Sequence, residues 1–372
     1  MKIKAFELER YFAMYEFSAP YLLSPSDCEP LTLEELLEMA NEESLKLWND
    51  LWLGYTQSQG HPLLREEVSK LYQDISPDKV LIVVPEEGIF MVMNVLLNKG
   101  DHIITTFPGY QSLYEIAASL GSEVSKWEPR KSENSRDFNV EDLKSLVQDN
   151  TKLIVFNFPH NPTGATLTNE KYIKILEFAK ERNIYVFSDE MYRMLEYSKE
   201  DALDSASDLY DNTISLFGVS KTFALAGLRI GWLTTKNKEI FKRLSTFKDY
   251  TTICCSAPSE ILSIIALKNK EIIIERNMNI IRNNLPLLDI FFNKHSNMFS
   301  WIKPKAGTIA FPELKTNAKI FELADDLVKK QGVMILPANV YEYSGNNFRL
   351  GFGRKNMPET LNKFEEYITN TL

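Results

Sequence analysis

The sequence predicts an α/β fold, in which a mainly parallel β-sheet is flanked by helices and a smaller α+β domain is attached. Short, nearly all-apolar runs rich in β-branched residues recur along the chain, and such runs are typical of strands buried on both faces of a parallel sheet. These runs alternate with segments of helical spacing over about residues 50–240, which indicates a single α/β domain.

The elements of this domain follow in chain order. The predicted strands are 80–84, 102–105, 153–158, 184–188, 213–217 and 230–233. Apolar stripes with helical spacing lie between them, one within 89–97 and another within 172–179. The charged stretch 130–137 is predicted to be a solvated loop.

The pattern changes after residue 240. The predicted elements there are a long helix at 261–281, a break at 293–297, strand-like pieces at 308–311, 333–336 and 349–352, and a final amphipathic helix from 358. The first 45 residues have no large core of their own, so we expect them to join this part. The predicted domains are therefore a large α/β domain, 46–245, and a small domain built from 1–45 and 246–372.

Composition and charge argue against several kinds of partner. The 372 residues carry 42 Lys and Arg against 51 Asp and Glu, a net charge of −9, whereas nucleic acids and anionic membranes favour a basic surface. No apolar stretch approaches the ~18–20 residues of a membrane span, and residues 1–10 lack the apolar core of a signal peptide. We therefore expect a cytoplasmic protein without a nucleic-acid or membrane partner.

Metal and nucleotide motifs are absent from the sequence. The three cysteines form no CxxC pair, and the four histidines, His160 among them, form no HExxH motif, so no metal site is predicted. Neither GxGxxG after a strand nor GxxxxGK[ST] occurs.

Three polar residues stand where predicted strands end. Asn161 lies in an Asn-Pro-Thr-Gly turn, Asp189 directly follows an apolar run, and Lys221 follows the next one. Taken singly, they are typical of a turn, a helix N-cap and a surface lysine. Because open α/β sheets bind ligands at the carboxyl ends of their strands, we expect all three at one edge of the sheet. A lysine among small apolar residues has a lowered pKa and forms Schiff bases with carbonyls.

The set resembles the aspartate aminotransferase family of pyridoxal-phosphate enzymes, class I/II and fold type I. The motifs are Asn161-Pro-Thr-Gly, Asp189-Glu-x-Tyr192 and Ser220-Lys221, with an arginine eight residues after the lysine, and the resemblance extends from Gly54-Tyr55 to Phe348-Arg349. Within the family the chain looks closest to class I/II aminotransferases, including members similar to capreomycidine synthase. The resemblance implies pyridoxal 5′-phosphate as the cofactor, and an amino acid and a 2-oxo acid as substrates.

The resemblance also implies roles for residues around the cofactor ring. Lys221, Asp189 and Tyr192 are the expected catalytic residues. Lys221 holds the cofactor and moves the α-proton of the substrate, and Asp189 keeps the pyridine nitrogen protonated. Asn161 and Tyr192 donate hydrogen bonds to the phenolic oxygen, and Tyr110 stacks on the ring.

The implied phosphate site departs from the family pattern. Arg229 and Ser220 are expected to bind the phosphate, together with backbone N–H groups of Glu86 and Glu87 at the start of a helix. That turn opens with a proline, which has no N–H, and the two carboxylates must point away from a dianion. Gly218 stands where many relatives have a phosphate-binding serine.

Two residues complete the implied site. Tyr55 matches a tyrosine that reaches the phosphate of the neighbouring subunit, which implies an obligate homodimer. Arg349 matches the arginine that clamps the substrate α-carboxylate, with Asn161 as a second substrate-binding residue. The side-chain pocket is expected to involve the segment 17–23. No second arginine stands out as a clamp for an acidic side chain.

The predicted function is transfer of an amino group between an amino acid and a 2-oxo acid through a pyridoxal-phosphate Schiff base on Lys221. Elimination by a lyase, cyclisation and racemisation start from the same carbanion, so Lys221 does not separate these alternatives. A third interpretation is a non-catalytic binding protein that keeps the fold; such relatives carry a DNA-binding segment, which is not expected here.

Overall fold

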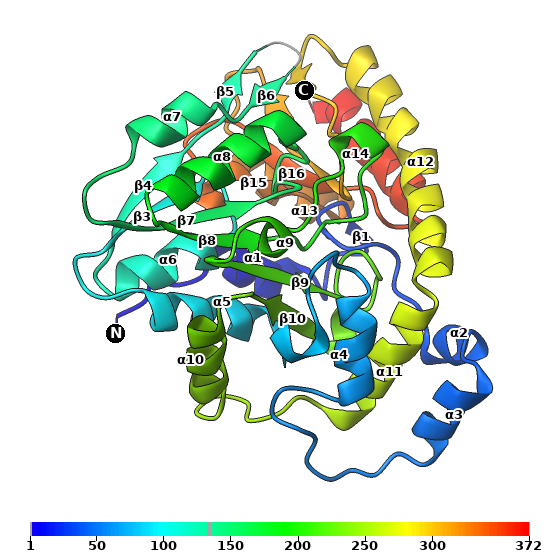
Figure 1. Ribbon diagram of the computed structural model, residues 1–372. Coiled ribbons are helices and arrows are strands. Elements are labelled where there is room, and N and C mark those ends of the chain that lie inside the picture. The colour runs from blue at the N-terminus through cyan, green and yellow to red at the C-terminus, as the bar shows by residue number, and fades with distance from the viewer. Residues whose placement is uncertain (1, 133–134, 372) are drawn as a thin grey trace.

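A seven-stranded sheet forms the centre of the protein (Figure 1). The computed structural model describes residues 2–132 and 135–371. In chain order the strands of this sheet are β2 (Val80–Val83), β3 (His102–Thr106), β4 (Glu123–Trp127), β7 (Thr151–Asn157), β8 (Tyr185–Asp189), β9 (Thr213–Gly218) and β10 (Gly231–Thr234). Their order in space is β2-β10-β9-β8-β7-β3-β4, and every pair is parallel except those of β10. The predicted α/β class with a mainly parallel sheet is confirmed.

Two features of the sheet were not predicted. β4 is an edge strand that is mostly exposed or half-buried, and its charged residues gave no continuous apolar run. β10 pairs antiparallel with both β2 and β9, although its sequence is as apolar and buried as the parallel strands. Strand direction depends on the path of the connecting chain, which the local pattern does not contain.

The sheet is buried on both faces, as the apolar runs indicated. In β7, Leu153 and Val155 pack into one apolar cluster, whereas Ile154 and Phe156 pack into another. The helices around the sheet are α4 (Pro62–Ser69), α5 (Pro85–Leu96), α6 (Ser112–Ser119), α7 (Val140–Ser145), α8 (Asn169–Glu181), α9 (Ala206–Leu209) and α10 (Lys238–Lys248). Since α8 contributes to the second cluster and α5 and α6 to the first, helices cover both faces.

The rest of the chain forms long helices and small sheets. These elements are α1 (Glu7–Tyr15), β1 (Tyr21–Leu22), α2 (Leu33–Glu38), α3 (Glu42–Asn49), α11 (Ala257–Lys268), α12 (Lys270–Lys294), β11 (Phe299–Ser300), β12 (Ile309–Ala310), β13 (Glu313–Leu314), α13 (Ile320–Gln331), β14 (Val333–Met334), β15 (Leu336–Pro337), β16 (Phe348–Gly351) and α14 (Met357–Thr371). β1 pairs in parallel with β14, so the N-terminal segment lies against the C-terminal part.

Two local predictions were wrong. The helix predicted over 261–281 is interrupted at Asn269, which ends α11 and precedes α12 and whose side-chain amide donates to the carbonyl of Ile265 at 2.8 Å. The stretch 130–137 is not simply a solvated loop, because β5 (Arg130–Lys131) and β6 (Arg136–Asp137) pair as a hairpin and Arg136 donates to the carbonyl of Phe311. Residues 133–134 lie outside the described part.

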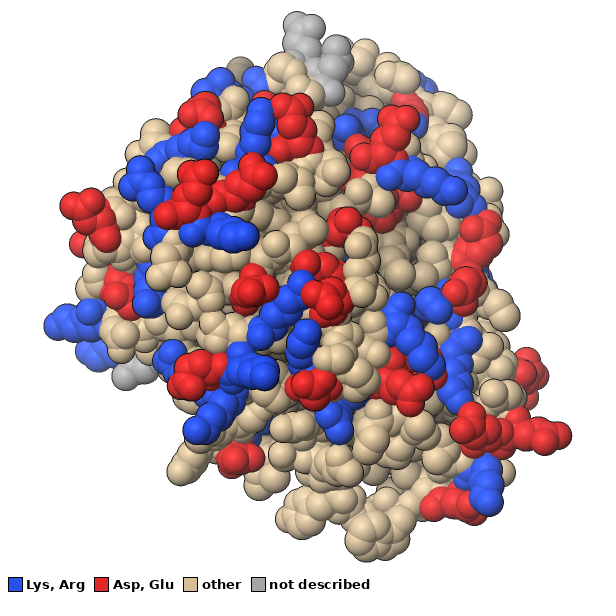
Figure 2. All heavy atoms as spheres, in the orientation of Figure 1, with Lys and Arg blue, Asp and Glu red and all other residues tan. Residues whose placement is uncertain are grey.

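Charges of both signs are interspersed on the face shown in Figure 2, without a continuous basic patch. None of the helices in the described part of the chain is long and apolar enough to cross a membrane.

Candidate active site

A cavity of about 380 Å³ lies at the carboxyl ends of β7, β8 and β9. Its size is within the range of small-molecule sites. The predicted site residues that line it are Glu86, Tyr110, Asn161, Asp189, Tyr192, Ser220, Lys221, Arg229 and Arg349. The structure thus brings together side chains that lie up to 263 residues apart in the sequence, from Glu86 to Arg349.

Lys221 lies just beyond the end of β9 and reaches into the cavity. Its Nζ donates a hydrogen bond to Oγ of Ser26 at 2.9 Å. Burial lowers the pKa of the Lys221 amine, and Arg349 and Arg229 lower it further, while Asp27 opposes the shift. Only a neutral amine attacks a carbonyl, so these surroundings favour the nucleophilic form.

Asp189 is the last residue of β8 and is only 5 % exposed. Burial raises the pKa of its carboxyl to about 7, and the nearby carboxylates of Glu86 and Glu190 act in the same direction. The backbone N–H of Met191, which donates to Oδ1 at 3.1 Å, and the amine of Lys221 oppose this shift. A cation placed directly against this buried carboxyl would stabilise its ionised form.

Asn161 links the turn after β7 to Arg349 on β16. Nη1 of Arg349 donates to Oδ1 of Asn161 at 3.2 Å, and Nη2 donates to the carbonyl of Ser24 at 3.0 Å. The backbone N–H of Asn161 donates to Oδ1 of Asn157 at 2.7 Å, and Nδ2 of Asn157 donates to the carbonyl of Asp189 at 2.9 Å. Asn157 therefore fixes two strand ends relative to each other.

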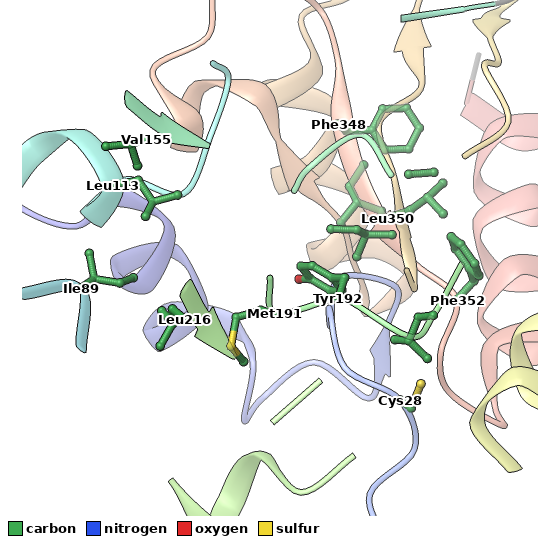
Figure 3. Close-up of a cluster of buried hydrophobic side chains, with 14 of the residues drawn as sticks. Cys28, Ile89, Leu113, Val155, Met191, Tyr192, Leu216, Phe348, Leu350 and Phe352 are labelled. Carbon is green, nitrogen blue, oxygen red and sulfur yellow. The ribbon is translucent and has the colours of Figure 1, made fainter. Parts of the chain in front are cut away.

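Tyr192 lies beside this network. It is buried, and burial raises the pKa of its phenol, while Arg349 and the hydroxyl of Ser26 lower it. Figure 3 shows Tyr192 and Met191 among the apolar side chains that join Leu216 of β9 to Leu350 of β16. The floor of the cavity is therefore continuous with the main apolar core, which holds these polar groups in place.

The residues present fit pyridoxal phosphate. Oγ of Ser220 is buried without a hydrogen-bond partner among the described residues, although it lines the cavity. Arg229 lines the same cavity, with its backbone in the left-handed conformation at φ 56°. An unpaired hydroxyl and a guanidinium in the lining of one cavity match a phosphate, a buried carboxyl matches a ring cation, and an amine with a lowered pKa matches an aldehyde.

Glu86 and Glu87 behave differently from each other. Glu87 lies outside the cavity lining, and its carboxylate accepts from the N–H of Thr252 at 3.1 Å and from its hydroxyl at 2.8 Å. Glu86 lines the cavity, and its carboxylate accepts from the hydroxyl of Ser112, which lies outside the lining. Burial raises the pKa of Glu86, while hydrogen bonds from Ser112 and Tyr110 oppose this shift.

Other predicted residues lie outside the cavity. Tyr55 is 86 % exposed on the loop after α3, and the structure does not bring it to the site within one chain. The substrate side-chain pocket was expected around 17–23. Phe17 is 94 % exposed and no residue of 17–23 lines the cavity, but residues on both sides of this stretch, within 8–16 and 25–27, do. His160 is buried against Phe138 and bonded to Thr163. In the described residues no His, Cys, Asp and Glu cluster could hold a metal.

Several residues of the site were missed from the sequence. Ser26 contacts Lys221 across 195 positions, and Arg354 also lines the cavity, paired with Asp27. No local motif marks Ser26 or Arg354. Asn157 could have been noticed, because it stands four residues before Asn161 at the end of an apolar run.

This combination of fold and site defines a pyridoxal-phosphate-dependent enzyme of fold type I. The model of the family "Aminotransferase class I and II" matches residues 22–364, and the chain belongs to that family. A PLP-dependent aminotransferase from Streptococcus suis superposes with a TM-score of 0.92 over 100% of this chain and 99% of that one, at 31% identity.

Two curated relatives are more distant. An aspartate aminotransferase of Pyrococcus horikoshii is 26% identical over 361 residues, covering 91% of this chain and 87% of the relative. A capreomycidine synthase of Streptomyces vinaceus is 25% identical over 266 residues, covering 72% of this chain and 67% of the relative.

Asp189→Asn is expected to change how stability depends on pH in the protein without cofactor. The carboxyl ionises near pH 4 in the unfolded chain but only at about 7 in the folded one, so the wild type loses free energy of unfolding as pH rises through this window. The amide does not ionise. Urea unfolding at pH 4 to 8 measures the free energy of unfolding of both proteins. As the pH rises, this free energy should increase in the variant relative to the wild type by up to about 4 kcal/mol. A difference that stays constant with pH would mean that the carboxyl ionises normally.

Proposed function

We propose that the protein transfers an amino group from an amino acid to a 2-oxo acid, with pyridoxal phosphate bound to Lys221. One observation carries the proposal: Lys221, Asp189, Arg349 and Asn161 meet in a single cavity, although they come from four separate parts of the chain. Family membership supports the same chemistry.

Each group has a distinct task in this reaction. Pyridoxal phosphate, when bound, supplies an electron sink for the bond that is broken at the substrate Cα. The guanidinium of Arg349 binds the substrate α-carboxylate: Asn161 and the carbonyl of Ser24 hold its Nη1 and Nη2 in the cavity, and its Nε is buried without a partner among the described residues. Lys221 takes the proton from Cα and returns a proton in the reverse half of the exchange.

The remaining groups orient and tune the site. Asp189 holds the ring cation, and Asn161 and Tyr192 donate to the phenolic oxygen of the ring. Asn161 accepts from Arg349, so it also keeps the carboxylate clamp in position. Ser220 and Arg229 bind the phosphate. Tyr110 covers the ring.

An absorbance screen tests the proposal. An amino donor should remove the visible absorbance of the lysine-bound cofactor, and a 2-oxo acid should restore it while becoming an amino acid. Separate addition of the two substrates should show two half-reactions that sum to the exchange. A cofactor-loaded protein whose spectrum responds to no amino acid would refute the proposal.

A second candidate keeps the cofactor but not the exchange. The similarity to a capreomycidine synthase favours a reaction other than amino-group exchange, and cyclisation, elimination or racemisation would use the same proton transfer by Lys221. These reactions need no acceptor. Product formed from labelled amino acid at the same rate with and without a 2-oxo acid would favour this candidate over transamination.

We also propose a homodimer in which Tyr55 completes the site of the partner subunit. Trp52, Leu53 and Tyr55 are 78 %, 81 % and 86 % exposed on one loop, and such a group of large apolar side chains is typical of an interface. Sedimentation of the cofactor-loaded protein should give twice the mass of the chain. A monomer with full activity would exclude this assembly.

A further inference from the structure

The helix α1 forms one wall of the active-site cavity, and this wall carries the carboxylates of Glu9 and Glu16. Glu9, Phe12 and Glu16 line the cavity and follow one another at intervals of three and four residues, which places them on one face of the helical segment. The ring of Phe12 lies 6.0 Å from the guanidinium of Arg349. The face of α1 therefore adjoins the group that binds the α-carboxylate.

This wall is held at both of its ends. The backbone N–H of Glu7 donates to Oε1 of Gln111 at 2.9 Å, before α6. The hydroxyl of Tyr15 donates to Oδ1 of Asp325 on α13 at 2.7 Å. Because α1 is hydrogen-bonded both to Gln111, next to α6, and to Asp325 on α13, Glu9 and Glu16 are held in position relative to the cavity.

Each basic group that lines the cavity already has an acidic counterpart. Nη2 of Arg354 donates to both carboxylate oxygens of Asp27, at 3.0 and 3.1 Å. Under the proposed function, Arg229 is matched by the phosphate and Arg349 by the α-carboxylate. Lys221 is used in the covalent bond to the cofactor. No basic group is left for an acidic substrate side chain.

The two carboxylates on α1 have no such counterpart. Within residues 2–132 and 135–371, neither Glu9 nor Glu16 makes an ion pair or accepts a side-chain hydrogen bond. Burial raises the pKa of Glu16, and the nearby carboxylates of Glu9 and Asp27 raise it further, although Arg354 and Lys221 oppose this. This part of the cavity therefore has an excess of negative charge.

An independent observation marks the same cavity as a ligand site. Oγ of Ser220 and Nε of Arg349 are buried in its lining without partners among the described residues, and both residues are less than 5 % exposed. Buried polar groups without partners are costly, and two anionic groups bound in the cavity, one at each residue, would satisfy them.

We propose that the amino acid substrate has a cationic side chain, a guanidinium or an ammonium, which Glu9 and Glu16 bind. This inference rests on the proposed function and adds the class of its substrate. The half-buried Glu16 contributes more than the exposed Glu9, because solvent screens an exposed ion pair. The neutral pair of Arg354 and Asp27 adds no net attraction for an acidic side chain.

Matched substrates test the proposal with the cofactor-loaded protein. Arginine is compared with citrulline, its neutral isostere, and lysine with norleucine, by the rate at which each removes the visible absorbance of the cofactor. The better cationic donor should exceed its neutral partner by about tenfold or more in kcat/KM. Glu16→Gln should lower this ratio about tenfold and Glu9→Gln about threefold. Glu7→Gln, on the same helix but outside the cavity, should leave it unchanged.

A binding measurement gives a second readout that does not depend on turnover. The compound 5-guanidinopentanoate carries a carboxylate and a guanidinium but no α-amine, and 5-ureidopentanoate is its neutral isostere. Calorimetry should show tighter binding of the guanidino compound, with the difference reduced in Glu16→Gln.

The outcomes distinguish a failure of the proposed substrate class from a failure of the proposed aminotransferase function. If neutral donors react and bind as well as cationic ones, or if both glutamine variants keep the wild-type ratio, the substrate class is wrong and the aminotransferase proposal stands. If no amino acid changes the spectrum of the loaded protein, the aminotransferase proposal fails and this inference fails with it.

Discussion

Lys221→Ala is expected to abolish turnover while leaving the protein folded. The amine is both the attachment point of the cofactor and the group that moves the α-proton, so its removal should lower the rate by at least about 10⁴-fold. In the described part of the chain its side chain makes one hydrogen bond, to Ser26, so little of the fold depends on it. Steady-state exchange assays and circular dichroism measure the two effects.

The control for this variant is Lys238→Ala, which removes an exposed lysine at the start of α10. It should keep wild-type activity and absorbance. Exchange at the wild-type rate in Lys221→Ala would contradict the assigned role of the amine. An unfolded Lys221→Ala protein would instead show that Lys221 has a structural role.

Asp189→Ala is expected to lower the rate by about 10³-fold or more. The carboxylate keeps the ring nitrogen protonated, and an uncharged ring is a weaker electron sink. Asp189→Asn should be impaired in the same direction, because an amide fills the space without holding the charge. Both variants should still bind the cofactor covalently, since Lys221 is unchanged.

The matched control is Asp211→Ala, an exposed carboxylate just before β9. It should leave the rate unchanged. A near-normal rate in Asp189→Ala would mean that this carboxylate does not contact the ring nitrogen.

The part of the site that lies at strand ends could be predicted from the sequence. Asn161, Asp189 and Lys221 each follow an apolar run, and parallel strands end at a common edge, so their meeting follows from local patterns. The roles of these residues came from the ordered motifs rather than from periodicity, because a lone turn, cap or lysine is common.

The wall formed by α1 could not be predicted in this way. Glu16, at the end of α1, and Ser26 and Asp27, after β1, reach the cavity through contacts between segments that are distant in sequence; the contact of Ser26 with Lys221 spans 195 positions. The antiparallel direction of β10 and the edge strand β4 were missed for a related reason. Pairing direction and edge position depend on tertiary arrangement, which a window of a few residues does not contain.

The central claim is that the cofactor is bound covalently to one amine, and reductive labelling tests it most directly. The loaded protein is treated with borohydride, which makes the bond between lysine and cofactor permanent, and its peptides are then mapped by mass. The account predicts a single modified residue, Lys221, and no label after Lys221→Ala. Labelling of a different lysine in an active protein, or full activity without any labelled lysine, would contradict it.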